Sequence, residues 1–172
     1  MEAEAGDSTV IGEEHPTPRS QGTSELTKIR FALSAEDQAV GVEAENLWAA
    51  TLEDRRYRID NVPFYVYGIS LDDVVRAEEI DGRLVFREVV SRSGHSTYRV
   101  LVKDSAGVSS AGFTRLWLAL EELGCGREIA SRRWIAIDVP PTTNVFSVYR
   151  ILESGEEQGV WSFDEGHCGH KV

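Results

Sequence analysis

The sequence has few cysteines and no long hydrophobic run, and these two shortages exclude several classes of protein. Only two cysteines occur in 172 residues, Cys125 and Cys168, and they match no disulfide framework. We expect both thiols to be free, as is usual in a reducing compartment. No run approaches the roughly 18 apolar residues of a membrane span, and the MEAEAGD start lacks the basic and apolar regions of a signal peptide. The sequence therefore predicts a soluble cytoplasmic protein with no membrane partner.

Positive charge is also scarce, because 18 Lys and Arg are opposed by 29 Asp and Glu, for a formal net charge of -11. This charge repels phosphate backbones, which makes nucleic acid an unfavourable partner, and it speeds association with a basic partner. Residues 1–26 contribute much of the acidity and have almost no bulky hydrophobic side chains. We expect a disordered tail there, with a start-site artefact or a partner-binding arm as the alternatives.

Residues 27–95 contain short hydrophobic alternations separated by turns. Ile29 and Phe31 lie two positions apart between polar neighbours, which predicts a half-buried strand. Asp81 and Gly82 separate two strand-like runs, and both residue types accept the positive φ that a type I′ hairpin turn needs. Short strands joined by such turns are typical of a small, curved barrel. We predict an SH3-like β-barrel subdomain over residues 27–95.

Residues 96–165 change to a mixture of strands and helices. Apolar residues at helical spacing predict a helix over residues 113–123, and Asn144 is placed to cap a second helix that Gly155 ends. Residues 129–139 between them are a strand or a bent pair of strands. The resulting β-α-β-α-β order predicts a ferredoxin-like plait, so the whole chain is expected to be α+β.

The last residues, 166–172, hold three potential metal ligands in His167, Cys168 and His170. No second cluster at zinc-finger spacing completes a tetrahedral set, and chain ends tend to fray. We therefore expect a loose tail, and we expect neither a metal nor a cofactor.

Three segments together resemble a known bacterial family. They are YRIDNVPF at residues 57–64, ISLDDVV at 69–75 and SGHSTYRV at 93–100. In this order and spacing they resemble the family called domain of unknown function 4265, over about residues 27–165. That family usually has glycine at the position where Asp72 stands here. The resemblance implies little about function, because no function is assigned to the family.

The stretch SGHSTYR, residues 93–99, is the strongest candidate site. Its hydroxyls, glycine, imidazole and guanidinium suit a polar or anionic ligand, with Arg99 as a fork for carboxylate or phosphate. The alternative is a structural bend between the barrel and the plait, in which the hydroxyls bond to turn amides. Asn61 either orients the ligand or forms an Asx-turn with backbone amides. Asp73, beside Asp72, binds a hard cation, acts as acid and base, or lies in a solvated acidic rim. The candidate ligand-binding residues are Asn61, Asp73, Ser93, Gly94, His95, Ser96, Thr97 and Arg99.

These features favour a non-catalytic binding or regulatory module whose site lies at the crevice between the subdomains. The partner would be a protein or a small anionic ligand, and one version is an immunity-type protein that neutralises a basic toxin. The alternative is an enzyme, hydrolytic in kind, in which His95 acts with Ser96 or Ser93 and a carboxylate such as Asp73. No G-x-S-x-G motif supports it. A third hypothesis, RNA binding by the plait, needs an exposed basic and aromatic sheet face.

Overall fold

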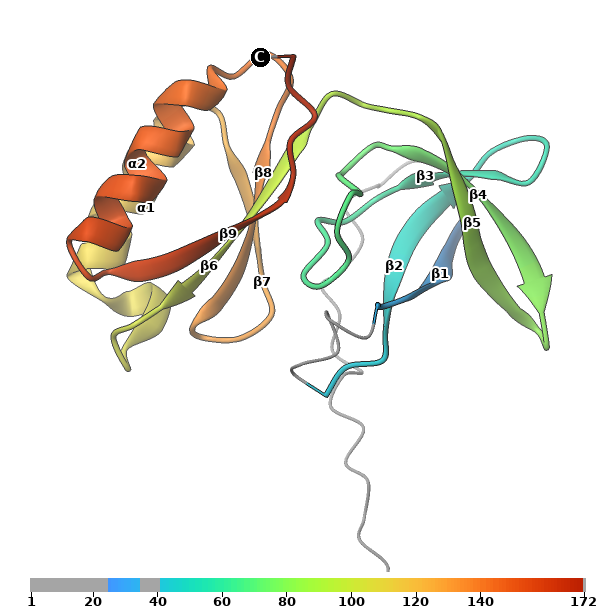
Figure 1. Cartoon of the computed structure of the whole chain (residues 1–172), viewed down its shortest axis with the longest axis horizontal. Coiled ribbons are helices and arrows are strands. Elements are labelled where there is room, and N and C mark those ends of the chain that lie inside the picture. The colour runs from blue at the N-terminus through green and yellow to red at the C-terminus, as the bar shows by residue number, and fades with distance from the viewer. Residues whose placement is uncertain (1–24, 35–40, 172) are drawn as a thin grey trace, which may run out of the picture.

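The computed structural model describes residues 25–34 and 41–171, which form two mainly antiparallel sheets and two α-helices (Figure 1). The chain is therefore of mixed α+β class, as the sequence predicts. The predicted disordered tail lies outside the described residues as far as residue 24. Among the helices of the described residues, none is long and apolar enough to cross a membrane.

The first sheet has five strands whose order closes on itself. They are β1 (Leu26–Ala32), β2 (Ala44–Thr51), β3 (Arg56–Ile59), β4 (Val74–Ile80) and β5 (Arg83–Ser91). Each strand pairs antiparallel with the next, and the sheet closes where Ile29 of β1 lies parallel to Leu84 of β5. Ile29 and Phe31 point into the core of this sheet, where Phe31 stacks on Phe86 with ring centroids 4.6 Å apart.

The hairpin between β4 and β5 turns at Asp81 and Gly82, which confirms the predicted turn. Their φ angles are +51° and +74°, in the left-handed region that a type I′ turn requires at both central positions. The hairpin carries the long β4–β5 arm away from the second sheet (Figure 1).

The second sheet has the strand order β7-β8-β6-β9, and both helices cover one of its faces (Figure 1). Its elements are β6 (Ser96–Val102), α1 (Ala111–Glu122), β7 (Gly126–Ile129), β8 (Trp134–Val139), α2 (Val145–Glu157) and β9 (Trp161–His167). Alternate side chains of β6 point to opposite faces. Tyr98, Val100 and Val102 pack in the core beneath the helices, whereas Arg99 points toward the first sheet.

Two details of this half correct the sequence-based prediction. The region predicted as one strand or a bent pair, residues 129–139, contains β8, and a separate strand, β7, lies before it. The two are joined by a turn in which the amides of Ala130 and Ser131 donate to the Trp134 carbonyl. The order is therefore β-α-β-β-α-β, one strand more than predicted. Gly155 does not end α2 but lies inside it. A Cβ at this position would lie 2.3 Å from the Trp161 ring, so the glycine makes room for that ring.

The C-terminal segment also differs from the expected loose tail. Gly166 and His167 belong to β9, and the amide of Gly169 donates to Ser96 Oγ at 2.9 Å. A Cβ on Gly169 would lie 2.1 Å from the carbonyl oxygen of His95. The segment is therefore packed closely against the start of β6, and it takes part in the candidate site.

Candidate functional site at the junction

Residues 60–73, between β3 and β4, join the two sheets. Glu45 of β2 is 1% exposed and accepts hydrogen bonds from the backbone amides of residues 64–66 at 2.8, 2.9 and 2.9 Å. On the other side, Glu128 of β7 accepts from the amide of Val62 at 3.0 Å. We call the place where this connection meets the start of β6 and the C-terminal segment the junction, meaning residues 60–73, 92–99 and 164–170.

Arg99 lies beneath this connection and is 2% exposed. Its guanidinium donates to the carbonyl oxygens of Pro63 and Val66, lies 3.4 Å from a carboxylate oxygen of Asp164, and packs 4.5 Å from the Tyr67 ring centroid. A guanidinium with these partners has few donors left for a ligand. Arg99 therefore holds the connection onto the second sheet, and this geometry does not support its predicted role as an anion fork.

Asp73 organises a second group of contacts and is 1% exposed. Its carboxylate accepts from the amides of Ser70 at 3.1 Å and Ser93 at 2.8 Å, from the Ser93 hydroxyl at 3.2 Å, and from Arg92 at 2.9 Å. The Ser70 and Thr97 hydroxyls are bonded to each other at 2.9 Å. The polar groups of Ser93, Asp73 and Thr97 are thus engaged within the protein.

Ser96, which is buried, is paired with the half-buried His170. Nε2 of His170 lies 3.1 Å from the carbonyl oxygen of Pro140, which only accepts, so Nε2 carries the donating proton. In the neutral ring Nδ1 then accepts the Ser96 hydroxyl at 2.7 Å, while the same oxygen accepts from the amide of Gly169. Ser96 is 0% exposed, so this pair fixes the C-terminal segment rather than presenting a hydroxyl to solvent.

His95 is the polar side chain of SGHSTYR that keeps a polar atom without a hydrogen bond in the described structure. Its Nδ1 bonds to Asp138 of β8 at 2.7 Å, and its Nε2 lies 3.9 Å from Asp72, beyond hydrogen-bond distance. The hydrogen bond to Asp138 raises the pKa of His95 above its ordinary value; burial opposes this, and the charges of Asp138, Asp72 and Asp73 add to it. The side chain is 15% exposed, so part of the imidazole reaches the surface at the edge of the junction.

The structure brings together most, but not all, of the sequence-predicted site residues. Asp73, Ser93 and His95 lie around one turn, where Gly94 has a φ of +86° and a Cβ would meet Pro141 at 3.1 Å. Asn61 takes no part in this turn, because its Oδ1 accepts from the backbone amide of Trp48 at 2.7 Å.

Sequence reasoning missed Asp138 and His170. The sequence around Asp138 does indicate a paired carboxylate. Asp138 is the one acidic residue of the apolar strand WIAIDV, and an acidic residue in such a strand is commonly paired. Its partner depends on strand register, which places Ser96 opposite Val139, next to Asp138. His170 was assigned to a loose end, and no pattern in the sequence indicated where that end packs.

The junction combines an oriented imidazole with an exposed carboxylate, Asp72, and it does not assemble a catalytic triad. The acid that orients His95 is Asp138 rather than Asp73, and no hydroxyl is bonded to Nε2 in the described structure. Within the same residues, no group of three or more His, Cys, Asp or Glu side chains is placed to hold a metal ion. The arrangement donates and accepts hydrogen bonds, and a hydrolytic role would require a nucleophile from outside the chain, such as water.

A solved structure shares this two-sheet architecture. A crystal structure described as a hypothetical protein from Neisseria gonorrhoeae is similar, with a TM-score of 0.71 and 20% sequence identity over 88% of this chain and 100% of that chain. This likeness shows a shared fold. A family model described as "Domain of unknown function (DUF4265)" matches residues 45–163, well over half of the chain. The chain therefore belongs to this family, which confirms the resemblance seen in the sequence. The search of curated proteins gives no match.

Proposed function

We propose that this protein is a non-catalytic binding module that docks a segment of a partner protein at the junction, through His95 and Asp72. The observation that carries the proposal is the unbonded Nε2 of His95, an oriented polar atom beside an exposed carboxylate. The hydrogen bond to Asp138 raises the pKa of His95, which extends the imidazolium form to higher pH, and in that form Nε2 also donates. One Asp72 oxygen is paired with Arg58 at 3.5 Å, and the carboxylate is 49% exposed. His95 then offers one donor to a partner, and the remaining lone pairs of Asp72 offer an acceptor.

A backbone peptide group matches this pair, because its carbonyl accepts from Nε2–H and its N–H donates to a carboxylate. Asp72, Asp73 and Asp138 surround the imidazole, so a free anion is less suitable here than a neutral or basic segment. This electrostatic argument favours a protein partner over the small anionic ligand that the sequence also suggested. It also suits a basic partner, which the net charge of -11 would attract.

The second candidate is a hydrolase, favoured by the Asp138–His95 pair, because an imidazole oriented by a buried carboxylate is a common general base. Ser96 and Ser93 do not support it as nucleophiles. Ser96 is bonded to His170, and the Ser93 hydroxyl donates to the Leu71 carbonyl at 2.7 Å. A binding role uses the same imidazole without requiring a nucleophile.

We also infer that the two halves are an SH3-like barrel and a ferredoxin-like plait. The closed strand order of the first sheet and its hairpin turn support the former. The β-α-β-β-α-β order, with sheet order β7-β8-β6-β9, supports the latter. Two free cysteines in the described structure support a reducing, cytoplasmic location.

The test is thermal unfolding of the full chain with a panel of capped tetrapeptides, with turnover of the same peptides and of simple esters measured in parallel. A peptide that binds only the folded state raises the midpoint. We expect some peptides, enriched in basic residues, to raise the midpoint of the wild type and of the control Arg115→Ala on α1. They should fail to do so for His95→Ala and Asp72→Asn.

The proposal is wrong if no peptide shifts the wild type, or if the shifts persist in both junction variants. Turnover that His95→Ala abolishes and Arg115→Ala retains would instead establish the hydrolase. His95→Gln, which keeps a side-chain amide for Asp138, serves as a folded variant if His95→Ala is unstable.

A further inference from the structure

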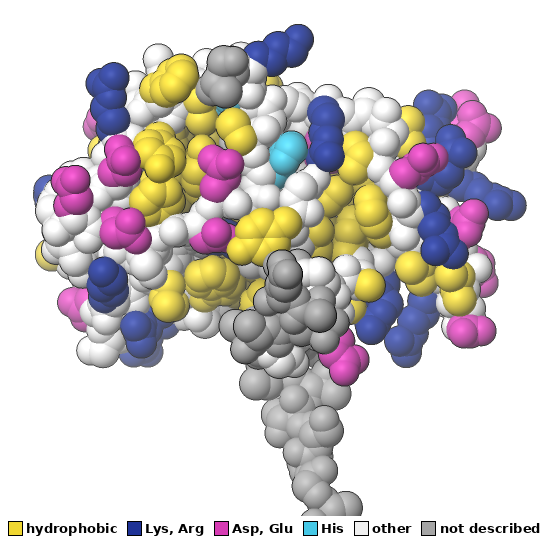
Figure 2. Space-filling view, in the orientation of Figure 1, with side chains coloured by type: hydrophobic (Ala, Val, Ile, Leu, Met, Phe, Trp, Pro, Cys, Tyr) yellow, Lys and Arg dark blue, Asp and Glu magenta, His cyan; other side chains and the backbone are white. Residues whose placement is uncertain are grey.

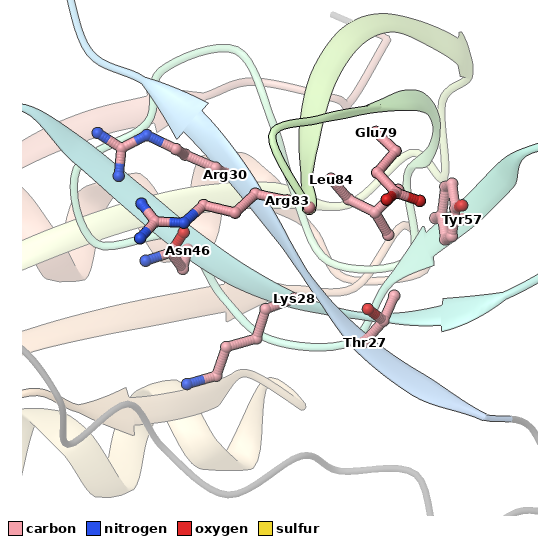
Figure 3. A pocket seen from close by; sticks show the side chains of 9 residues that line it. Thr27, Lys28, Arg30, Asn46, Tyr57, Glu79, Arg83 and Leu84 are labelled. Atoms are coloured by element: carbon pink, nitrogen blue, oxygen red, sulfur yellow. The ribbon is translucent and has the colours of Figure 1, made fainter.

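A second polar site lies on the barrel, away from the junction. A depression of about 590 Å³ opens beside β1 and the start of β5 (Figure 3). This volume is within the range of small-molecule sites in proteins. Its charged and hydrogen-bonding side chains include Lys28, Arg30, Asn46, Tyr57, Glu79 and Arg83.

Closure of the barrel brings the cations of this depression together from distant parts of the sequence. Ile29 of β1 and Leu84 of β5 are paired in parallel, and both contact the core of the first sheet. Because side chains alternate along a strand, the flanking Lys28, Arg30 and Arg83 point outward. Figure 3 shows the guanidinium groups of Arg30 and Arg83 close together on one side of the depression.

These three cations have no ion pair within residues 25–34 and 41–171, where the side chains are described. Lys28 does pack over the Trp48 ring, with Nζ 4.8 Å from its centroid. Other barrel arginines are paired with carboxylates, namely Arg56, Arg58, Arg76, Arg87 and Arg92. Figure 2 shows Asp and Glu side chains interspersed with the Lys and Arg side chains over the first sheet, on the right of the view. Glu79 lines the same depression, and the like charges of Lys28, Arg30 and Arg83 repel one another where they gather.

We propose that the depression binds the phosphate group of a small phosphate ester, with Arg30 and Arg83 as the main ligands of the dianion. Guanidinium forks match phosphate oxygens, and Lys28 adds a third positive charge. Asn46 lies beside the two arginines, whereas Glu79 and Tyr57 lie on the opposite side of the depression (Figure 3). A ligand with hydroxyl or amino donors at its other end would therefore place them toward Glu79.

The ligand is small rather than a polynucleotide, because Glu79 and the net charge of -11 oppose a polyanion. The test is calorimetric titration with ribose 5-phosphate, inorganic phosphate, ribose and a single-stranded oligothymidylate. We expect ribose 5-phosphate to bind and ribose not to bind, with affinity falling as salt is added. Arg30→Gln and Arg83→Gln should each weaken binding by about tenfold to a hundredfold, the effect of one charge-assisted hydrogen bond.

Arg87→Gln is the matched control, since Arg87 lies on the same strand as Arg83 and is paired with Glu78. It should leave the affinity for ribose 5-phosphate unchanged, and so should His95→Ala, which separates this site from the junction. Arg30→Gln and Arg83→Gln should keep or raise the thermal midpoint, because each relieves like-charge repulsion.

Three results would overturn the proposal. The first is no binding of ribose 5-phosphate to the wild type, and the second is binding that both arginine variants retain. The third is tighter binding of the oligothymidylate than of ribose 5-phosphate, lost in the same variants, which would identify a nucleic-acid site instead.

Discussion

Replacement of Arg99 by methionine should destabilise the protein strongly, because this buried guanidinium joins its two halves. Methionine keeps much of the aliphatic volume of arginine and removes the donors. The carbonyl oxygens of Pro63 and Val66 lose a partner in a place where Arg99 is only 2% exposed. The perturbation is therefore mainly a loss of buried hydrogen bonds.

The magnitude follows from these contacts. Each buried acceptor left without a partner costs about 1–3 kcal/mol. Asp164 is 45% exposed and adds little, because solvent screens its ion pair with Arg99. Part of the loss is offset, since the variant no longer buries a charge. We expect a net loss of about 3 kcal/mol in the free energy of unfolding, a large share of the roughly 5–15 kcal/mol typical of a folded domain.

The assay is urea unfolding followed by tryptophan fluorescence, with Arg115→Met on α1 as the control. Arg115 is exposed and bonds to Gln158, so its replacement should change the free energy of unfolding by less than about 0.5 kcal/mol. A loss below about 1 kcal/mol for Arg99→Met would refute the reasoning, because the guanidinium would then be dispensable to the fold and available to a ligand.

Three further predictions concern other buried groups. Glu45→Ala should cost about 3 kcal/mol in urea unfolding, because three backbone amides lose a buried carboxylate, and a cost under about 1 kcal/mol would contradict this. His95 should titrate above its ordinary pKa in NMR, and its contribution to stability should be complete below about pH 6.5 and lost as pH rises through the raised pKa. Asp138→Asn should remove that upward shift, and an unchanged titration would exclude the assigned pair. Gly155→Ala should cost about 1–3 kcal/mol by overpacking against Trp161, and an unchanged thermal midpoint would contradict this.

Local patterns in the sequence were sufficient to predict several elements of the fold. Alternation placed Ile29 and Phe31 in the core, and Asp81-Gly82 specified a hairpin turn. Asn144 caps α2 through its side chain, which accepts from the Ser147 amide at 3.1 Å. Each of these features depends on neighbours within a few residues, which is why sequence alone could indicate it.

Features that depend on distant packing could not be predicted. Gly155 looked like a helix end, because its role is set by the Trp161 ring rather than by the helix itself. The sequence suggests Asp73 as the carboxylate that orients His95, whereas strand register supplies Asp138. Arg99 looked available to a ligand because the segment that covers it lies more than thirty residues earlier in the chain, at Pro63 and Val66.

The central claim is that a protein segment docks at His95 and Asp72, and amide chemical-shift mapping tests it most directly. The uniformly ¹⁵N-labelled full chain would be titrated with the tetrapeptide that raises the thermal midpoint most. The account predicts shifts centred on residues 68–73, 93–96 and 167–170, together with a shift of the His95 Nε2 resonance. Shifts centred on the helices or on the barrel depression, with the His95 resonances unchanged, would contradict it.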